Sequence, residues 1–168
     1  MSRSLLIVDG YNVLHALFPG ASKEDLFARR EWLTDRLVSL VAHQGASAVL
    51  VFDGRGTQST SSRPVRGAPI EVCFAGGRFT ADTLIAKRIA EQSADVRVTV
   101  VSADQEVQRT ATRAGVSRMT PRELGAQLAE PAEALDSPAE ASTIPTRVED
   151  KVDVETLRKL EALRKRKH

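Results

Sequence analysis

Short apolar runs that do not alternate with polar residues constrain the fold of this chain most strongly. The clearest runs cover residues 4–9, 48–53 and 97–102 and are rich in Leu, Ile and Val. Weaker runs cover residues 69–74 and 116–119. A strand that is apolar along its whole length has both faces buried, which is typical of a parallel sheet covered by helices. We therefore predict five strands in one mostly parallel sheet.

Helical patterns fill the intervals between the predicted strands. The predicted helices start at Ser22, Thr80, Asp104 and Thr120. Ser22 is followed three residues later by Asp25, as in a capping box, and Gly115 suits the C-terminal end of the third helix. Strands that alternate with helices predict an α/β fold, a three-layer sandwich with right-handed crossovers around a mostly parallel central sheet.

Composition divides the chain into three parts. Residues 1–129 carry the strand and helix patterns and form one domain of ordinary size. Residues 130–150 are dominated by Ala, Glu, Pro, Ser and Thr, which predicts a flexible linker. Residues 151–168 have apolar residues spaced three apart and end in the basic run 164–168, which predicts an amphipathic C-terminal helix with a basic end.

Hydropathy, cysteine and histidine patterns exclude several classes of protein. No stretch reaches the ~18 uncharged apolar residues that a membrane helix needs, so we expect a cytoplasmic protein. Cys73 is the only cysteine, and we expect it to be a buried strand residue. His15, His43 and His168 are scattered along the chain. A metal site would therefore use oxygen ligands, which favours Mg²⁺ or Mn²⁺ over zinc.

Four aspartates stand where the predicted strands end. Asp9 and Asp53 close the first two strong runs, Asp104 follows the third, and Asp82 lies in the first turn of a predicted helix. Ligands of open α/β sheets bind beyond the carboxyl ends of the strands. Each aspartate alone could be a turn or cap residue. Four carboxylates at one edge repel one another unless a divalent cation lies among them, and such a cation can promote phosphodiester hydrolysis.

Tyr11 and Asn12, which follow Asp9 closely in sequence, are further candidates for the site. Asn12 follows a glycine turn that would aim its amide back at the carboxylates, although Asn12 could instead cap the next turn. Tyr11 could stack on a nucleic-acid base or pack in the core. Sequence alone leaves both pairs of alternatives open.

We call the sheet edge with Asp9, Asp53, Asp82 and Asp104 the acidic edge. Basic residues close to it would be needed to hold a polyanion. The segment 54–69 contains Arg55, Arg63 and Arg66 but no acid, and its glycines predict a mobile lid near the same edge. A disordered surface segment is the competing interpretation. Arg78, in a glycine-containing loop, is another candidate for RNA binding.

Several motifs of this chain match those of a known family. Val-Asp-Gly-Tyr-Asn-Val at 8–13, Val-Phe-Asp at 51–53, Thr-Ala-Asp-Thr-Leu-Ile at 80–85 and Ser-Ala-Asp at 102–104 resemble the motifs of the YacP-like branch of the NYN domain family, within the PIN-like nucleases. The likeness extends from about residue 4 to residue 128. It implies a PIN-like fold and metal-dependent RNA cleavage, with a connection to mRNA decay on bacterial ribosomes.

The resemblance also implies roles for particular residues. Asp9, Asp82 and Asp104 correspond to the metal-site residues, and Asn12 and Asp53 correspond to supporting residues. On this basis we expect a metal-dependent endoribonuclease in which Mg²⁺ or Mn²⁺ activates the water that attacks phosphorus, leaving 5′-phosphate and 3′-hydroxyl ends.

Two other functions remain open from the sequence. Phe79 and Ala86 stand where many relatives carry acids, which favours an RNA- or ribosome-binding module that has lost cleavage. A small-molecule enzyme, such as a phosphatase, is the second alternative. Against it, no phosphate-binding glycine motif follows the first strand, and Tyr11 stands where an Asp-x-Asp phosphatase needs its second acid.

Overall fold

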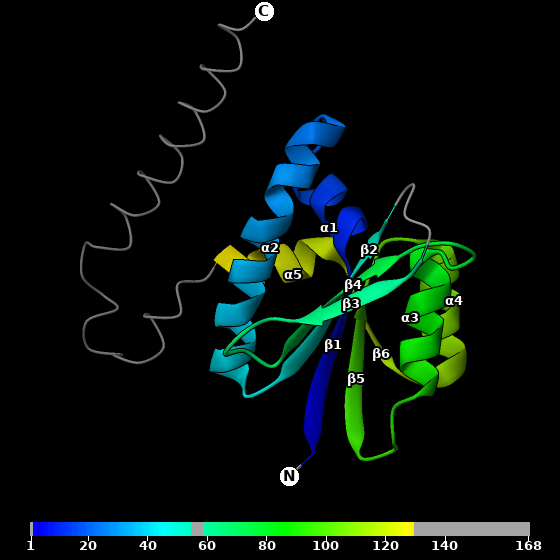
Figure 1. The fold of residues 1–168 in the computed structure, drawn as a ribbon. Coiled ribbons are helices and arrows are strands. Elements are labelled where there is room, and N and C mark those ends of the chain that lie inside the picture. Colours follow the sequence, from blue (N-terminus) through cyan, green and yellow to red (C-terminus); the bar gives the residue numbers. More distant parts are fainter. Residues whose placement is uncertain (1, 55–58, 130–168) are drawn as a thin grey trace, which may run out of the picture. The chain divides into compact units, whose positions relative to one another are not determined.

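The computed structural model describes residues 2–54 and 59–129, which form one sheet with helices on both faces (Figure 1). The elements in order are β1 (Arg3–Asp9), α1 (Gly10–Leu17), α2 (Lys23–Gln44), β2 (Ser47–Asp53), β3 (Ser61–Pro64), β4 (Ile70–Ala75), α3 (Ala81–Ala90), β5 (Val96–Val101), α4 (Gln105–Ala114), β6 (Ser117–Met119) and α5 (Pro121–Ala129). All five predicted strands are present, and so are the four helices that were predicted to start at Ser22, Thr80, Asp104 and Thr120.

The sheet winds outward from its central strand in both directions. The strand order is β3-β4-β2-β1-β5-β6, and each neighbouring pair is parallel except β3 and β4. The chain leaves β1 toward β2 and β4 and then returns to place β5 and β6 on the other side. The winding direction therefore changes between β1 and β5, and the carboxyl ends of these two strands flank the expected ligand site.

Alternating side chains of the buried strands separate two apolar cores. Leu6 and Val8 of β1 belong to the core that contains residues of α1, α2 and α5. Leu5 and Ile7 belong to the core that contains residues of α3 and α4. Because both faces of the sheet are covered, its central strands need apolar residues at every position, which explains the continuous runs in the sequence. The predicted α/β sandwich is confirmed.

Local capping interactions fix where the helices begin and end. The Ser22 hydroxyl accepts a hydrogen bond from the Asp25 backbone N–H, and the Asp25 carboxylate accepts one from the Ser22 N–H, which completes the predicted capping box. The side chains of Thr80 and Asp104 also accept backbone N–H hydrogen bonds, at the starts of α3 and α4. Gly115 ends α4 in the left-handed region at φ 71°, where glycine is free of steric conflict.

The structure contains two elements, α1 and β3, that were not predicted from the sequence. Helix α1 starts directly at Gly10 without a side-chain cap hydrogen bond, so it lacks the usual N-terminal pattern of a helix. Strand β3 replaces part of the expected mobile lid, and all four of its side chains are exposed. An exposed edge strand that ends in Pro64 has no apolar pattern to reveal it.

Some predictions concern residues outside the described ranges. These are Arg55, the linker at 130–150 and the basic helix at 151–168, which all stay predictions. Within residues 2–54 and 59–129, no helix is long and apolar enough to cross a membrane.

Gly10 allows the start of α1 to pack closely on β2. A Cβ atom at this position would overlap the Phe52 ring, which is only 1% exposed and therefore cannot move aside easily. We expect Gly10→Ala to lower the free energy of unfolding by about 1–3 kcal/mol in urea titrations.

Gly125→Ala is the matched control for Gly10→Ala. A Cβ at Gly125 would meet the tip of the flexible Leu17 side chain, and alanine improves helix propensity within α5 by roughly 1 kcal/mol. We expect this variant to stay close to the parent in stability. Equal stability of the Gly10 and Gly125 variants would contradict the close contact of α1 with Phe52.

Candidate functional site

A buried polar pair occupies the point where the winding of the sheet reverses. Asp9 is the last residue of β1 and is 8% exposed, and Ser102 directly follows β5 and is 2% exposed. The Ser102 hydroxyl donates a hydrogen bond of 3.1 Å to Oδ2 of Asp9. A hydrogen bond between residues 93 positions apart in sequence thus links the carboxyl ends of β1 and β5.

Backbone groups of the loop after β5 are held by side chains that lie close to this pair. Oδ1 of Asn12 accepts a hydrogen bond of 2.7 Å from the Ala103 N–H. The Asp104 N–H donates to the Ser102 hydroxyl at 3.0 Å, and the Gln108 side-chain amide donates to the Ser102 carbonyl at 3.1 Å. The Asn12 amide oxygen therefore points at the loop 102–104, and its bond there goes to a backbone N–H rather than to a carboxylate.

Asp104 serves as the cap of α4 as well as a member of the acidic edge. Its Oδ1 accepts hydrogen bonds from the N–H groups of Glu106 at 2.8 Å and Val107 at 3.3 Å. Both bonds use the same carboxylate oxygen, so Oδ2 takes no part in the cap. The cap interpretation that the sequence left open is realised, and it is compatible with Oδ2 binding a further group.

Asp53 and Asp82 complete the acidic edge from neighbouring elements. Asp53 is the exposed last residue of β2, and Asp82 is exposed in the first turn of α3. Val49 and Val51 of β2 face the core that contains α3 and α4, so the alternation of the strand puts Asp53 on that face too. All four predicted aspartates therefore lie at one edge of the sheet.

The carboxylates interact electrostatically across this edge. Burial raises the pKa of Asp9 to about 6, the Ser102 hydrogen bond opposes that rise, and the negative charges of Asp82 and Asp104 add to it. The pKa of Asp82 is also raised, first by partial loss of hydration and then by the charges of Asp104, Asp53 and Glu106. Negative charge is thus concentrated where a cation would relieve it.

The chemistry of these donors fits a hard divalent cation. All of the candidate ligands are carboxylate oxygens, which Mg²⁺ and Mn²⁺ prefer. In the described part of the chain, however, no three Asp, Glu, His or Cys side chains are close enough together to hold one ion. Magnesium usually keeps several waters and takes only one or two carboxylates from the protein, so a site with fewer than three direct carboxylate ligands is compatible with this ion.

Two of the predicted basic residues, Arg63 and Arg66, do not lie at the acidic edge. Arg63 pairs with Val72 in the middle of β3 and β4, and its guanidinium carbon lies 5.7 Å from the centre of the Phe74 ring, on the face of α2. Arg66 lies in the turn that precedes β4, at the opposite end of the sheet. The expectation that both lie beside the acids is wrong, because β3 runs antiparallel and carries the chain away from that edge.

Arg78 and Tyr11 do lie at the carboxyl edge of the sheet. Arg78 is exposed in the loop between β4 and α3. Tyr11 is half-buried at the start of α1, and its ring meets the Phe52 ring edge-on with 5.0 Å between centroids. The packing alternative for Tyr11 therefore describes its position in this structure.

Three residues of this region had no assigned role in the sequence analysis. Ser102 binds Asp9, Gln108 binds the Ser102 carbonyl, and the charge of Glu106 acts on Asp82. Ser102 could have been found, because it follows the apolar pair Val100 and Val101 at the end of a predicted strand and stands two residues before Asp104. Glu106 and Gln108 resemble ordinary polar residues of a helix, so only the fold reveals their positions.

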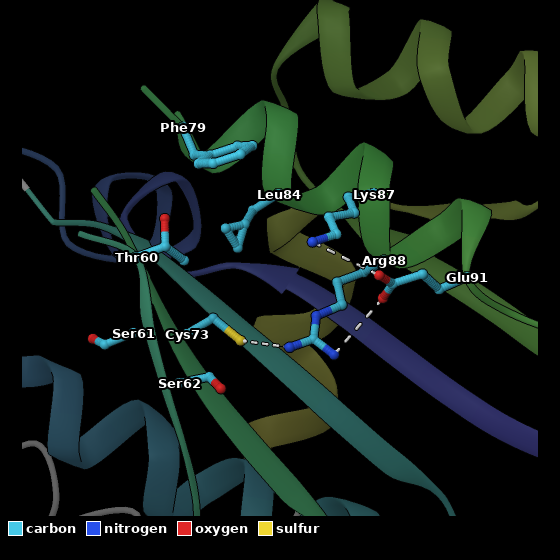
Figure 2. A pocket seen from close by; sticks show the side chains of 9 residues that line it. All are labelled: Thr60, Ser61, Ser62, Cys73, Phe79, Leu84, Lys87, Arg88 and Glu91. Carbon is cyan, nitrogen blue, oxygen red and sulfur yellow. Dashed lines mark hydrogen bonds and ion pairs between the residues drawn. The ribbon is translucent and has the colours of Figure 1, made fainter. Parts of the chain in front are cut away.

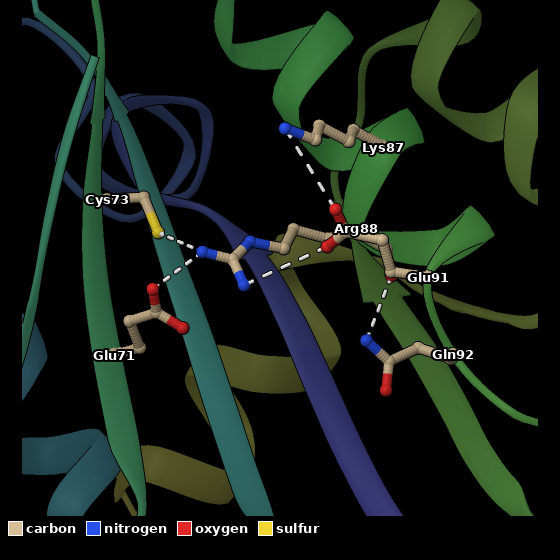
Figure 3. Close-up of polar contacts among 6 residues, drawn as sticks. All are labelled: Glu71, Cys73, Lys87, Arg88, Glu91 and Gln92. Carbon is tan, nitrogen blue, oxygen red and sulfur yellow. Dashed lines mark hydrogen bonds and ion pairs between the residues drawn. The ribbon is translucent and has the colours of Figure 1, made fainter.

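A separate concavity of about 240 Å³ lies between α3 and the strands β3 and β4 (Figure 2). Its charges are paired: Arg88 binds Glu71 at 2.6 Å and lies 4.0 Å from Glu91, which is 3.9 Å from Lys87 (Figure 3). Arg88 also donates to Sγ of Cys73 at 3.5 Å. Cys73 is fully buried as predicted, and burial raises the pKa of its thiol, which keeps it in the unreactive protonated form.

Comparison with known proteins agrees with this architecture. The family model of the YacP-like NYN domain matches residues 6–165. Two crystal structures of Rae1 (YacP) from Bacillus subtilis resemble the chain. A mutant form has a TM-score of 0.62 at 24% identity, covering 74% of each chain. The second has a TM-score of 0.60 at 23% identity, covering 96% of this chain and 94% of that chain.

None of the curated proteins that were searched matches the chain. At these identities the two crystal structures show the fold alone, and that fold is PIN-like. The family model, by contrast, spans most of the sequence, including all four aspartates of the acidic edge. The chain therefore belongs to the YacP-like NYN domain family, a family of nuclease-like domains.

Proposed function

We propose that this protein is a metal-dependent endoribonuclease. The observation that carries the proposal is the buried Asp9–Ser102 pair at the reversal point of the sheet, with the charges of Asp82 and Asp104 acting on Asp9. A carboxylate in such a position is destabilised when ionised, and a protein keeps it only where a cation or a proton compensates. Membership of a nuclease-like family supports phosphodiester hydrolysis as the reaction.

Each residue of the edge has a role in this proposal. Asp9, Asp82 and Asp104 would hold Mg²⁺ or Mn²⁺ partly through waters of the ion, because no three side chains of the described residues can ligate one ion directly, and Asp53 would support them from the neighbouring strand. The ion, when bound, supplies a water of lowered pKa and offsets negative charge on the phosphate. The Ser102 hydroxyl donates a hydrogen bond to Oδ2 of Asp9, which would hold this carboxylate in one orientation for the ligand. Asn12 holds the backbone of the loop after β5, which keeps Asp104 close to Asp9.

We also propose mRNA as the substrate, on or near the ribosome in the cytoplasm, with hydrolysis leaving 5′-phosphate and 3′-hydroxyl ends. This assignment rests on the resemblance to YacP-like proteins. No histidine or lysine is needed as the base, because an oxygen-bound divalent ion activates water by itself.

An RNA- or ribosome-binding module without cleavage is the second candidate. Two observations favour it: the carboxylates of the described residues form no three-ligand group, and Phe79 is 46% exposed where relatives carry an acid. An exposed aromatic ring beside the site can stack on a base without any chemistry. The two candidates differ in whether RNA is cut.

Cleavage of labelled single-stranded RNA separates these candidates. We expect cleavage with Mn²⁺ or Mg²⁺, none with EDTA, and a rate at least ~100-fold lower for Asp82→Asn, because one charged ligand is lost. Asp35→Asn is the control, since it removes an equal charge from the exposed face of α2.

Three outcomes would contradict the hydrolase. Undiminished cleavage by Asp82→Asn would show that the reaction occurs elsewhere. Binding without cleavage in every metal, on naked RNA and on translating ribosomes, would favour the binding module. Activity on a phosphomonoester but not on RNA would favour a small-molecule phosphatase.

The buried Asp9 also predicts how stability depends on pH without metal. The pKa of Asp9 is about 6 in the folded chain, against ~4 in an unfolded chain, so ionisation opposes folding. The stability that accompanies protonated Asp9 is complete below pH ~4 and is lost as the pH rises through ~6. In EDTA we therefore expect Asp9→Asn to stabilise the protein by about 2–3 kcal/mol at pH 8 and to have little effect at pH 4.

Urea titrations at the two pH values measure this difference. Asp53→Asn is the control, because it removes an exposed carboxylate from the same edge. Mn²⁺ should then stabilise the parent more than Asp9→Asn. A variant that is less stable than the parent at pH 8 would contradict the unfavourable burial of this charge.

Ser102 acts in this scheme as a positioning residue. We expect Ser102→Ala to weaken Mn²⁺ binding roughly tenfold, because residues that orient a metal ligand typically contribute that much. Thermal stability measured against Mn²⁺ concentration gives the apparent affinity. Ser102→Thr, which keeps the hydroxyl, should restore it. A purely structural role would lower stability equally with and without Mn²⁺ and leave the affinity unchanged.

A further inference from the structure

A second concavity, of about 420 Å³, lies beside α4 and β6. Its lining residues are Gln105, Gln108, Arg109, Thr112, Arg113 and Arg118. Five of them follow one another on α4 at spacings of three, one, three and one, so they form a single stripe along the helix. Arg118 comes from β6, where it lies opposite Val100 of β5. We refer to this concavity as the α4–β6 groove.

Charge distinguishes the α4–β6 groove from the concavity beside α3. No acid lines the groove, whereas Glu91 lines the concavity beside α3 and the basic residues there are paired (Figures 2 and 3). Arg109 pairs with Glu106 at 2.9 Å, but both side chains are more than 60% exposed, so water screens this pair strongly. Arg113 and Arg118 have no ion pair within the residues that the structure describes. The side chains that line the groove therefore carry a net positive charge.

The groove begins directly beside the acidic edge. Gln105 follows Asp104 in sequence, and Gln108 donates its amide hydrogen bond to the carbonyl of Ser102, which holds Asp9. From Gln105 to Arg113, α4 rises ~12 Å, a distance that a few nucleotides cover at the ~3.4 Å rise of a stacked strand. A chain whose phosphate lies at the acidic edge can thus continue into the groove.

We propose that the α4–β6 groove binds the sugar–phosphate backbone of single-stranded RNA next to the scissile phosphate. Guanidinium groups bind phosphate oxygens with two parallel hydrogen bonds, and glutamine and threonine side chains can bind ribose hydroxyls or phosphates. No aromatic ring lines the groove, so it recognises the backbone rather than the bases. The position of the scissile phosphate rests on the proposed function, whereas RNA binding by the groove does not.

The test measures binding by the full chain in EDTA, where metal-dependent cleavage cannot occur. Fluorescence anisotropy of a short labelled RNA at several salt concentrations gives the affinity and its salt dependence. We expect Arg113→Gln combined with Arg118→Gln to weaken binding roughly tenfold and to reduce the slope of log affinity against log salt by about 1.4, since each phosphate contact to a single strand contributes ~0.7.

Two further double variants serve as controls. Arg3→Gln with Arg97→Gln removes the same charge from the exposed amino-terminal parts of β1 and β5, and it should bind RNA like the parent. Arg113→Lys with Arg118→Lys should keep the salt slope of the parent but lose affinity, because lysine lacks the paired donors. Thermal unfolding of each variant confirms that it is folded.

The proposal is overturned if the Arg113 and Arg118 glutamine variant keeps the affinity and slope of the parent, or if the parent does not bind single-stranded RNA. A separate cleavage assay in Mn²⁺ tests the hydrolase. If the parent binds through the groove but does not cleave, the hydrolase fails and the groove stands. If the parent cleaves and the glutamine variant has an unchanged KM, the groove fails and the hydrolase stands.

Discussion

The hydrogen bond from Ser102 to Asp9 joins the two strands between which the sheet changes its winding direction. It is a weak compensation for burying a carboxylate, because the pKa of Asp9 remains raised to about 6 in spite of it. Further hydrogen bonds hold the loop after β5 around this pair. Asn12 and Gln108 hold the backbone around Ser102, and Asp104 then starts α4 at the same edge.

Most of the fold could be predicted because its determinants are local in the sequence. Burial on both faces leaves an uninterrupted apolar run in each central strand, and a cap such as Ser22 with Asp25 needs only residues three positions apart. β3 could not be predicted, since an exposed edge strand needs no apolar side chains. The misplacement of Arg66 follows from this omission, because an antiparallel return reverses which end of the sheet a residue reaches.

The acidic edge was predictable for a related reason: the last residue of each parallel strand reaches the same edge, whatever the details of packing. The partners of each aspartate were not predictable. Whether Asp104 caps a helix or faces an ion depends on which of its oxygens the backbone of α4 uses, and here only Oδ1 is used. The arginines of the α4 stripe are visible as a helical spacing, but the groove also needs Arg118 from another element.

The negative charge of the acidic edge and the positive charge of the α4–β6 groove would have complementary roles in binding RNA. Concentrated carboxylates repel RNA, so a nuclease of this kind needs positive charge close by but not among the acids, where it would displace the cation. α4 meets both requirements because Asp104 caps its N-terminus and Glu106 lies in its first turn, while its stripe of polar and basic residues leads away from them. In the proposed enzyme, the position of one helix would therefore fix the distance between the cation and the RNA backbone.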